Sequence, residues 1–251
     1  MAHFFKEKRG AMKKYGVFSA LVVVSAIAAG GSAYGGEAHK GITGPFATPM
    51  DVTKKCLECH ADAATDIMKT SHWTWSTEQD IEGKGKVMLG KKNAVNNFCI
   101  SIDSNWPRCT SCHISYGWKD AKFDFNDKNR VDCLVCHDGS GTYKKAPPAA
   151  GMPFGFTGNP ELDAKPIDLV AVAQSVGKPA KKNCVSCHGF GGGGNNVKHG
   201  DIDSSMVNPT KAIDVHMGSD SLNFQCTECH TTQKHNIKGN AMIVTPGGKS
   251  Q

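Results

Sequence analysis

The sequence beyond residue 33 has no long aliphatic run of the kind that forms buried strands, and aromatic residues make up only 8% of the chain. It also has no basic patch interleaved with aromatic side chains, which argues against binding of nucleic acid. The formal net charge of +6 does not change this view. Residues 1–33 carry five basic side chains and one acidic, a surplus of four, so +2 remains for residues 34–251.

Residues 1–33 have the order of a secretory signal peptide. Basic side chains between Lys6 and Lys14 precede an apolar run from Gly16 to Gly30, and Gly31-Ser32-Ala33 offers small residues for cleavage. The run is too short to span a bilayer comfortably. We therefore expect export to the periplasm with residues 1–33 removed. The alternative is an uncleaved segment that associates the protein with the membrane.

Only one of the eleven cysteines stands outside a repeated motif. The other ten form five copies of Cys-x-x-Cys-His, which are Cys56-x-x-Cys59-His60, Cys109-x-x-Cys112-His113, Cys133-x-x-Cys136-His137, Cys184-x-x-Cys187-His188 and Cys226-x-x-Cys229-His230. This is the attachment signature of c-type haem. Two thiols three residues apart reach the two vinyl groups on one porphyrin edge, and the histidine binds the iron as the proximal ligand.

Two other chemistries use Cys-x-x-Cys pairs, and the repetition argues against both. Zinc ribbons combine two such pairs, and thioredoxin-like centres use one, but neither needs a histidine after every second cysteine. A histidine follows in five cases out of five, in a chain with an export signal. The sequence therefore predicts five covalently bound c-type haems.

Five haems fix the expected architecture, because the porphyrins would supply much of the apolar interior that side chains supply elsewhere. We expect residues 34–251 to form one mainly α-helical, loop-rich domain, with a multihaem cytochrome c fold wrapped around closely packed haems. The clearest helix candidates are 61–75 and 167–176. The first cysteines of successive motifs lie 53, 24, 51 and 42 residues apart. The short second step predicts contact between the second and third haems.

Histidines outside the motifs are the candidates for the sixth iron ligands. Once residues 1–33 are removed, five remain, namely His39, His72, His199, His216 and His235. Five haems and five spare histidines would give bis-histidine coordination throughout, which suits electron transfer and leaves no open iron position. Ligation by Met206 or Met217 is the alternative. Cys99, the unpaired cysteine, is either a buried structural thiol or a thiol beside a haem face.

Several segments outside the haem motifs resemble the octahaem tetrathionate reductase family, whose relatives include hydroxylamine oxidoreductase and multihaem nitrite reductases. The resemblance covers nearly all of residues 34–251. It is carried by GPFATPMDVTKKCLECH at 44–60, SHWTW at 71–75, KKNAVNNFCISI at 91–102, PRCTSC with GWKD downstream, VDCLVCH, GGGG-xx-VKHGD and CTECHTT.

The resemblance implies a periplasmic multihaem oxidoreductase with one catalytic haem that takes a lysine amine as ligand. Family members reduce tetrathionate and also act on nitrite or hydroxylamine. Cys99 matches the family's cysteine near the catalytic haem, and the second motif is our candidate for that haem. Lys198 is the preferred lysine ligand and Lys119 the runner-up. A lysine must be neutral to bind iron, so it needs a desolvated position.

The sequence departs from the family pattern in length, since it ends 21 residues after His230 and lacks three haem motifs. We interpret the chain as a natural five-haem version of the family, a fragment or the product of a frameshift. Two functions follow. One is a periplasmic electron-transfer protein between a quinol-linked donor and other redox partner proteins. The other is a reductase of small sulfur or nitrogen oxyanions or hydroxylamine. Homo-oligomerisation is left open.

Overall fold

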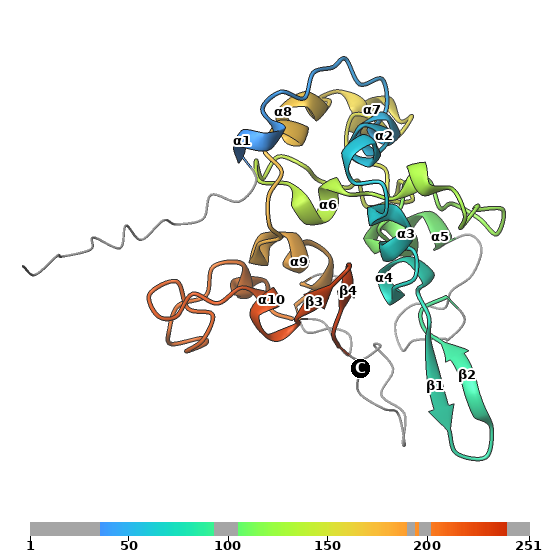
Figure 1. The fold of residues 1–251 in the computed structure, drawn as a ribbon, viewed down its shortest axis with the longest axis vertical. Coiled ribbons are helices and arrows are strands. Elements are labelled where there is room, and N and C mark those ends of the chain that lie inside the picture. The colour runs from blue at the N-terminus through green and yellow to red at the C-terminus, as the bar shows by residue number, and fades with distance from the viewer. Residues whose placement is uncertain (1–35, 93–104, 190–193, 196–201, 240–251) are drawn as a thin grey trace, which may run out of the picture. The chain divides into compact units, whose positions relative to one another are not determined.

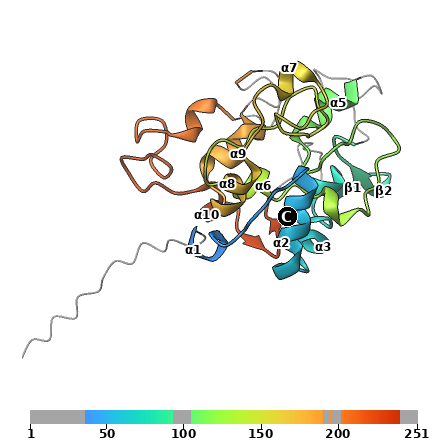
Figure 2. The same ribbon diagram turned by 90° about the horizontal axis from the view of Figure 1, so that it is seen from above.

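The computed structural model describes residues 36–92, 105–189, 194–195 and 202–239. The chain divides into two units between Ala33 and Tyr34, and the first unit contains no described residue. The second unit consists mostly of short helices joined by loops (Figures 1 and 2). Its helices are α1 (Gly36–His39), α2 (Pro49–Cys59), α3 (Ala63–Ile67), α4 (Ser71–Thr74), α5 (Trp106–Cys109), η2 (Thr110–Cys112), η3 (Lys128–Arg130), α6 (Leu134–His137), α7 (Pro160–Asp163), α8 (Leu169–Gln174), α9 (Lys181–His188), η4 (Ser204–Val207) and α10 (Cys226–Cys229).

Two antiparallel hairpins are the sheet structure of the described residues. In the first, β1 (Thr77–Ile81) pairs with β2 (Gly85–Leu89), with Thr77 opposite Leu89. In the second, β3 (Thr232–Gln233) pairs with β4 (Asn236–Ile237). The sequence did not predict the first hairpin, because its two buried β1 side chains, Thr77 and Gln79, are polar and hide the usual alternation.

The longest described helix, α2, begins where its sequence specifies. The Asp51 carboxylate accepts hydrogen bonds from the backbone N–H (2.9 Å) and the hydroxyl (2.8 Å) of Thr48. Pro49 occupies the first turn, where its missing N–H costs nothing. A hydrogen bond from Lys54, together with the bonds from Thr48, holds the pKa of Asp51 below its usual range. The cap fixes the start of α2, which carries the first haem motif at its other end.

The two predicted helices are both shorter than expected. The predicted helix over 61–75 is wrong as one element, because α3 and α4 are separated by an extended residue, Thr70, whose hydroxyl bonds to the Ile67 carbonyl (2.7 Å). The helix predicted over 167–176 is α8. Asp168 caps it by accepting from the N–H groups of Val170 and Ala171, both at 3.0 Å. A capping side chain therefore sets the start of α8, and a side-chain hydrogen bond to the preceding turn marks the break before α4.

Side-chain packing produces two modest apolar clusters. The first comprises Val52, Tyr116, Leu134, Tyr143, Leu169, Val172 and Ala173. The second comprises Ala64, Trp73, Ile114 and Val131. Both clusters include residues within or next to a haem motif, so the core and the motifs share one interior. Within the described residues, no helix is long and apolar enough to cross a membrane.

Candidate haem-binding sites

Each Cys-x-x-Cys pair lies on or at the edge of a short helix, where residues three apart share one face. The motifs occupy the end of α2, the junction of α5 with η2, helix α6, the end of α9, and α10. In every copy the histidine directly follows the second cysteine, at or just beyond the helix end. None of these ten cysteines is in a disulfide. The local fold therefore presents two thiols and one imidazole together, five times.

Three motif histidines face a histidine from a distant part of the chain. The ring centres of His60 and His39 are 6.2 Å apart. Those of His188 and His72 are also 6.2 Å apart. Those of His137 and His235 are 6.3 Å apart. The structure thus brings together three of the spare histidines with the first, fourth and third motifs respectively.

These separations match two axial ligands on one iron. A metal–imidazole nitrogen bond is about 2.0 Å long and the ring centre lies roughly 1.1 Å beyond that nitrogen, so opposing rings on one metal have centres about 6.2 Å apart. The three measured separations are equal to this distance within 0.1 Å. The residues present therefore fit haem iron at three motifs.

Hydrogen bonds to the second ring nitrogen orient two of the motif histidines. Nδ1 of His137 lies 2.8 Å from the Gly177 carbonyl, and Nδ1 of His230 lies 2.8 Å from the Lys238 carbonyl. A carbonyl only accepts, so Nδ1 carries the proton and Nε2 keeps its lone pair for a metal. This arrangement is usual for metal-binding histidine. Among described groups, the buried Nδ1 of His235 has no hydrogen-bond partner, which also suits an iron ligand.

Burial lowers the pKa of two of the facing histidines, which favours the neutral imidazole that metal binding requires. Burial and then the charge of His188 lower the pKa of His72 to about 4. Burial and then His137 lower the pKa of His235. Lys234 and His235 form the two-residue turn between β3 and β4, and both have positive φ (48° and 63°). Such a turn is costly without glycine, so the position of His235 is held by strained backbone.

The second motif differs from these three. The His113 ring is fully buried and packs against indoles, with ring centres 4.6 Å from Trp118 and 5.4 Å from both Trp73 and Trp75. Its Nδ1 is bonded to the Ser115 hydroxyl (2.6 Å) and its Nε2 to the Trp73 carbonyl. Burial lowers its pKa to about 3. In the described ranges, no histidine ring faces His113.

The remaining predicted ligands are placed as follows. The imidazole of His216 is exposed and packs on Phe224 (6.2 Å), and within the described part of the chain no motif histidine faces it. Met206 and Met217 are half-buried, and Lys119 is exposed rather than desolvated. Cys99, Lys198 and His199 lie outside the described residues.

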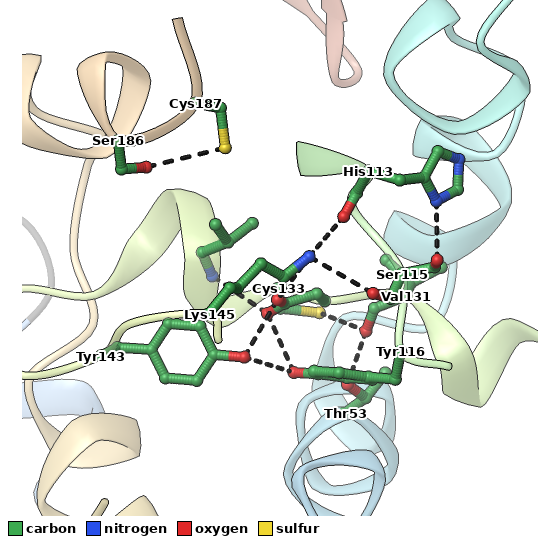
Figure 3. A network of polar contacts seen from close by, with 12 residues as sticks. Thr53, His113, Ser115, Tyr116, Val131, Cys133, Tyr143, Lys145, Ser186 and Cys187 are labelled. Atoms are coloured by element: carbon green, nitrogen blue, oxygen red, sulfur yellow. Dashed lines mark hydrogen bonds and ion pairs between the residues drawn. The ribbon is translucent and has the colours of Figure 1, made fainter. Parts of the chain in front are cut away.

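Sequence reasoning missed a buried polar network between the second and third motifs. Its members are Tyr116, Asp132, Tyr143 and Lys145, joined by hydrogen bonds and an ion pair (Figure 3). A signal was present, because Asp132 directly precedes Cys133 and a buried charge beside a motif demands partners. The distant partner Lys145 had no such signal, since it follows Lys144 in a polar loop.

The segments that carry the second and third motifs are also paired directly, by an antiparallel bridge between Ser115 and Val131. Contact between the haems themselves stays a prediction. No group of three or more histidine, cysteine or acidic side chains suited to one metal ion occurs among the described residues. The paired cysteines there do not converge as in a zinc ribbon. A loop-rich helical chain whose thiol pairs and facing histidines are arranged in this way is a multihaem c-type cytochrome.

Comparison with solved structures agrees. The octahaem cytochrome c from Shewanella oneidensis is 56% identical, with a TM-score of 0.72, over 83% of this chain and 44% of that chain. This likeness shows the multihaem cytochrome c fold and supports covalent c-type haems that transfer electrons. The chain thus spans under half the length of that structure. An uncharacterised protein of Archaeoglobus fulgidus is 24% identical over 237 residues, 78% of each chain. No family model matches.

Proposed function

We propose that the protein is a periplasmic electron-transfer protein with five covalently bound haems, one at each Cys-x-x-Cys-His motif. The observation that carries this proposal is the set of three histidine pairs 6.2–6.3 Å apart, each joining a motif to a distant segment. When bound, c-type haem supplies reversible one-electron transfer, and two histidine ligands leave no open iron position for a substrate. The signal-like residues 1–33 support the location.

Contacts between motifs give the route for electrons. Thiols of different motifs lie close enough to shift one another's pKa in three places, Cys56 with Cys133, Cys112 with Cys187, and Cys184 with Cys226. These sulfur atoms would hold the haems of their motifs. The first motif is therefore next to the third, and the fourth is next to both the second and the fifth.

The third and fourth motifs are joined by side-chain contacts rather than by thiols. The Asn183 amide, in α9, donates to the carbonyls of Val135 (3.3 Å) and Asp138 (3.1 Å), at and beyond α6. The route therefore runs from the first motif through the third to the fourth, and branches there to the second and fifth. We infer that a quinol-linked donor and a second redox protein dock near its ends.

The haem count tests the proposal directly. The intact mass of the purified, exported protein should exceed that of the processed chain by five haem groups. Replacing Cys226 and Cys229 together by serine should remove one haem and leave four, because only the fifth motif loses its thiols. Replacing the exposed Ser186, which lies between two motif cysteines, by alanine is the matched control and should leave five. A mass with fewer than five haems in the unaltered protein would refute the proposal.

The second motif supports a second candidate function, reduction of tetrathionate, nitrite or hydroxylamine at its haem. Among the described residues, the buried His113 ring packs against indole rings and no histidine ring faces it. That arrangement leaves the sixth position for another ligand, and the resemblance to tetrathionate reductases points to Lys198, with Cys99 nearby. A lysine amine held in an enclosed, partly apolar site would be neutral enough to bind iron.

This reductase role predicts an effect of one lysine. With reduced viologen as donor, Lys198→Ala should lower turnover of the active substrate by at least about 100-fold, since the ligand tunes the iron that performs the chemistry. Lys119→Ala, at an exposed lysine, should retain full turnover. Equal rates for Lys198→Ala and the unaltered protein would exclude Lys198 from the site. Absence of turnover with all three substrates would leave electron transfer as the function.

A further inference from the structure

A buried ion pair lies between the second and third motifs. Nζ of Lys145 lies 3.2 Å from Oδ2 of Asp132, and their side chains are 7% and 0% exposed. The same ammonium donates to the backbone carbonyl of His113 and to that of Ser115 (3.3 Å) (Figure 3). The positive end of the pair is thus attached to the backbone of the second motif's histidine.

The negative end belongs to the third motif. Asp132 directly precedes Cys133, and its carboxylate accepts from the hydroxyls of Tyr116 and Tyr143, both at 2.9 Å. It also accepts from the backbone N–H of Val135, inside the third motif, at 3.0 Å. With the ammonium, four donors hold the carboxylate in place. Burial, and then the charge of Asp132, raise the pKa of both tyrosines, so they stay protonated donors.

Fixed charges of this kind change reduction potentials. Adding an electron to a haem adds one negative charge, which a nearby buried cation stabilises and a nearby buried anion opposes. Stability alone does not account for the pair, since a buried ion pair is often no more stable than apolar residues of the same volume. We propose that the Lys145–Asp132 pair raises the reduction potential of the second-motif haem relative to the third-motif haem, and so directs electrons toward the second motif.

This inference rests on the proposed haems at these two motifs. The inference and the proposed function can nevertheless fail separately. If mass measurement finds either motif without haem, the proposed function fails. If both haems are present, their reduction potentials are measured by redox titration, monitored by absorbance and electron paramagnetic resonance. These potentials test the effect of the Lys145–Asp132 pair. The third-motif haem is identified in a His235→Met background, because exchanging its second ligand displaces its potential alone.

The double variant Lys145→Met with Asp132→Asn removes both charges and keeps the volumes similar. The potential gap between the two haems should shrink by about 59 mV, a tenfold change in the ratio of the two reduced forms for one-electron couples. Lys145→Arg keeps the charge and should keep the gap. Lys165→Met, the same loss of charge at an exposed lysine, should also keep it. An unchanged gap in the double variant, with both haems present, would overturn the inference.

A milder variant keeps the test available if the double variant does not fold. Tyr143→Phe removes one donor to Asp132 without changing any charge, so the carboxylate becomes less neutralised and should lower the third-motif potential. The gap should therefore widen. A gap that narrows or stays the same in Tyr143→Phe would count against a role in redox tuning and leave the network a structural one.

Discussion

Replacing His72 by alanine is expected to convert one haem from six-coordinate low-spin to five-coordinate high-spin. The ring centre of His72 lies 6.2 Å from that of His188, so His72 is the expected second ligand at the fourth motif. Loss of an imidazole ligand also changes the iron's potential, which axial ligands set over a range of about 0.8 V in haem proteins. The fourth motif is the branch point of the proposed route, so transfer from the first motif to the second and fifth should fall sharply. Magnetic circular dichroism of the oxidised protein measures the change in spin state.

His216→Ala is the matched control for this prediction. His216 is exposed, and within the described residues it faces no motif histidine. The variant should keep the low-spin signal of each haem that the unaltered protein has. A high-spin haem in His216→Ala, together with none in His72→Ala, would show that the histidine pairs are assigned wrongly.

Removal of haem is expected to abolish cooperative folding. The two apolar clusters of the described residues are small, and α6, the motif helix that contributes Leu134 to the first cluster, is only four residues long. Helices this short are not stable by themselves. The porphyrins would therefore supply the missing apolar contact, and binding of the cofactor would be coupled to folding, as with structural metals.

Expression of residues 34–251 in a reducing cytoplasm, where haem attachment does not occur, provides the haem-free chain. Its thermal scan by circular dichroism should show no sigmoidal transition, whereas the haem-loaded protein at the same concentration should unfold cooperatively. A cooperative transition in the haem-free chain, with near-ultraviolet signals from the buried tryptophans, would mean that side chains alone suffice for the core.

Motif chemistry made the haem anchors predictable, because two thiols and an imidazole must be adjacent in sequence to reach one porphyrin. Partners from distant segments were harder. His39, His72 and His235 could be named as spare histidines, but only the folded chain shows which motif each one faces. Their pairing depends on how loops return to the core, and no local pattern encodes it.

The same limit explains the features that were missed. The break between α3 and α4 depends on the Thr70 hydroxyl, which competes with helical hydrogen bonding in a way that apolar periodicity does not record. Lys145 lies 32 residues from His113, whose carbonyl it contacts, and in the sequence it resembles any loop lysine. Long-range polar contacts of this kind are visible only in three dimensions, and here they lie beside the motifs most relevant to chemistry.

The central claim is that the chain holds five haems, of which the first, third and fourth have two histidine ligands. Electron paramagnetic resonance of the oxidised, exported protein, with integrated intensities referred to its measured haem content, tests it most directly. The account predicts low-spin bis-histidine signals equal to at least three of five haems. Low-spin bis-histidine intensity below three haems, with the remainder high-spin, would contradict it.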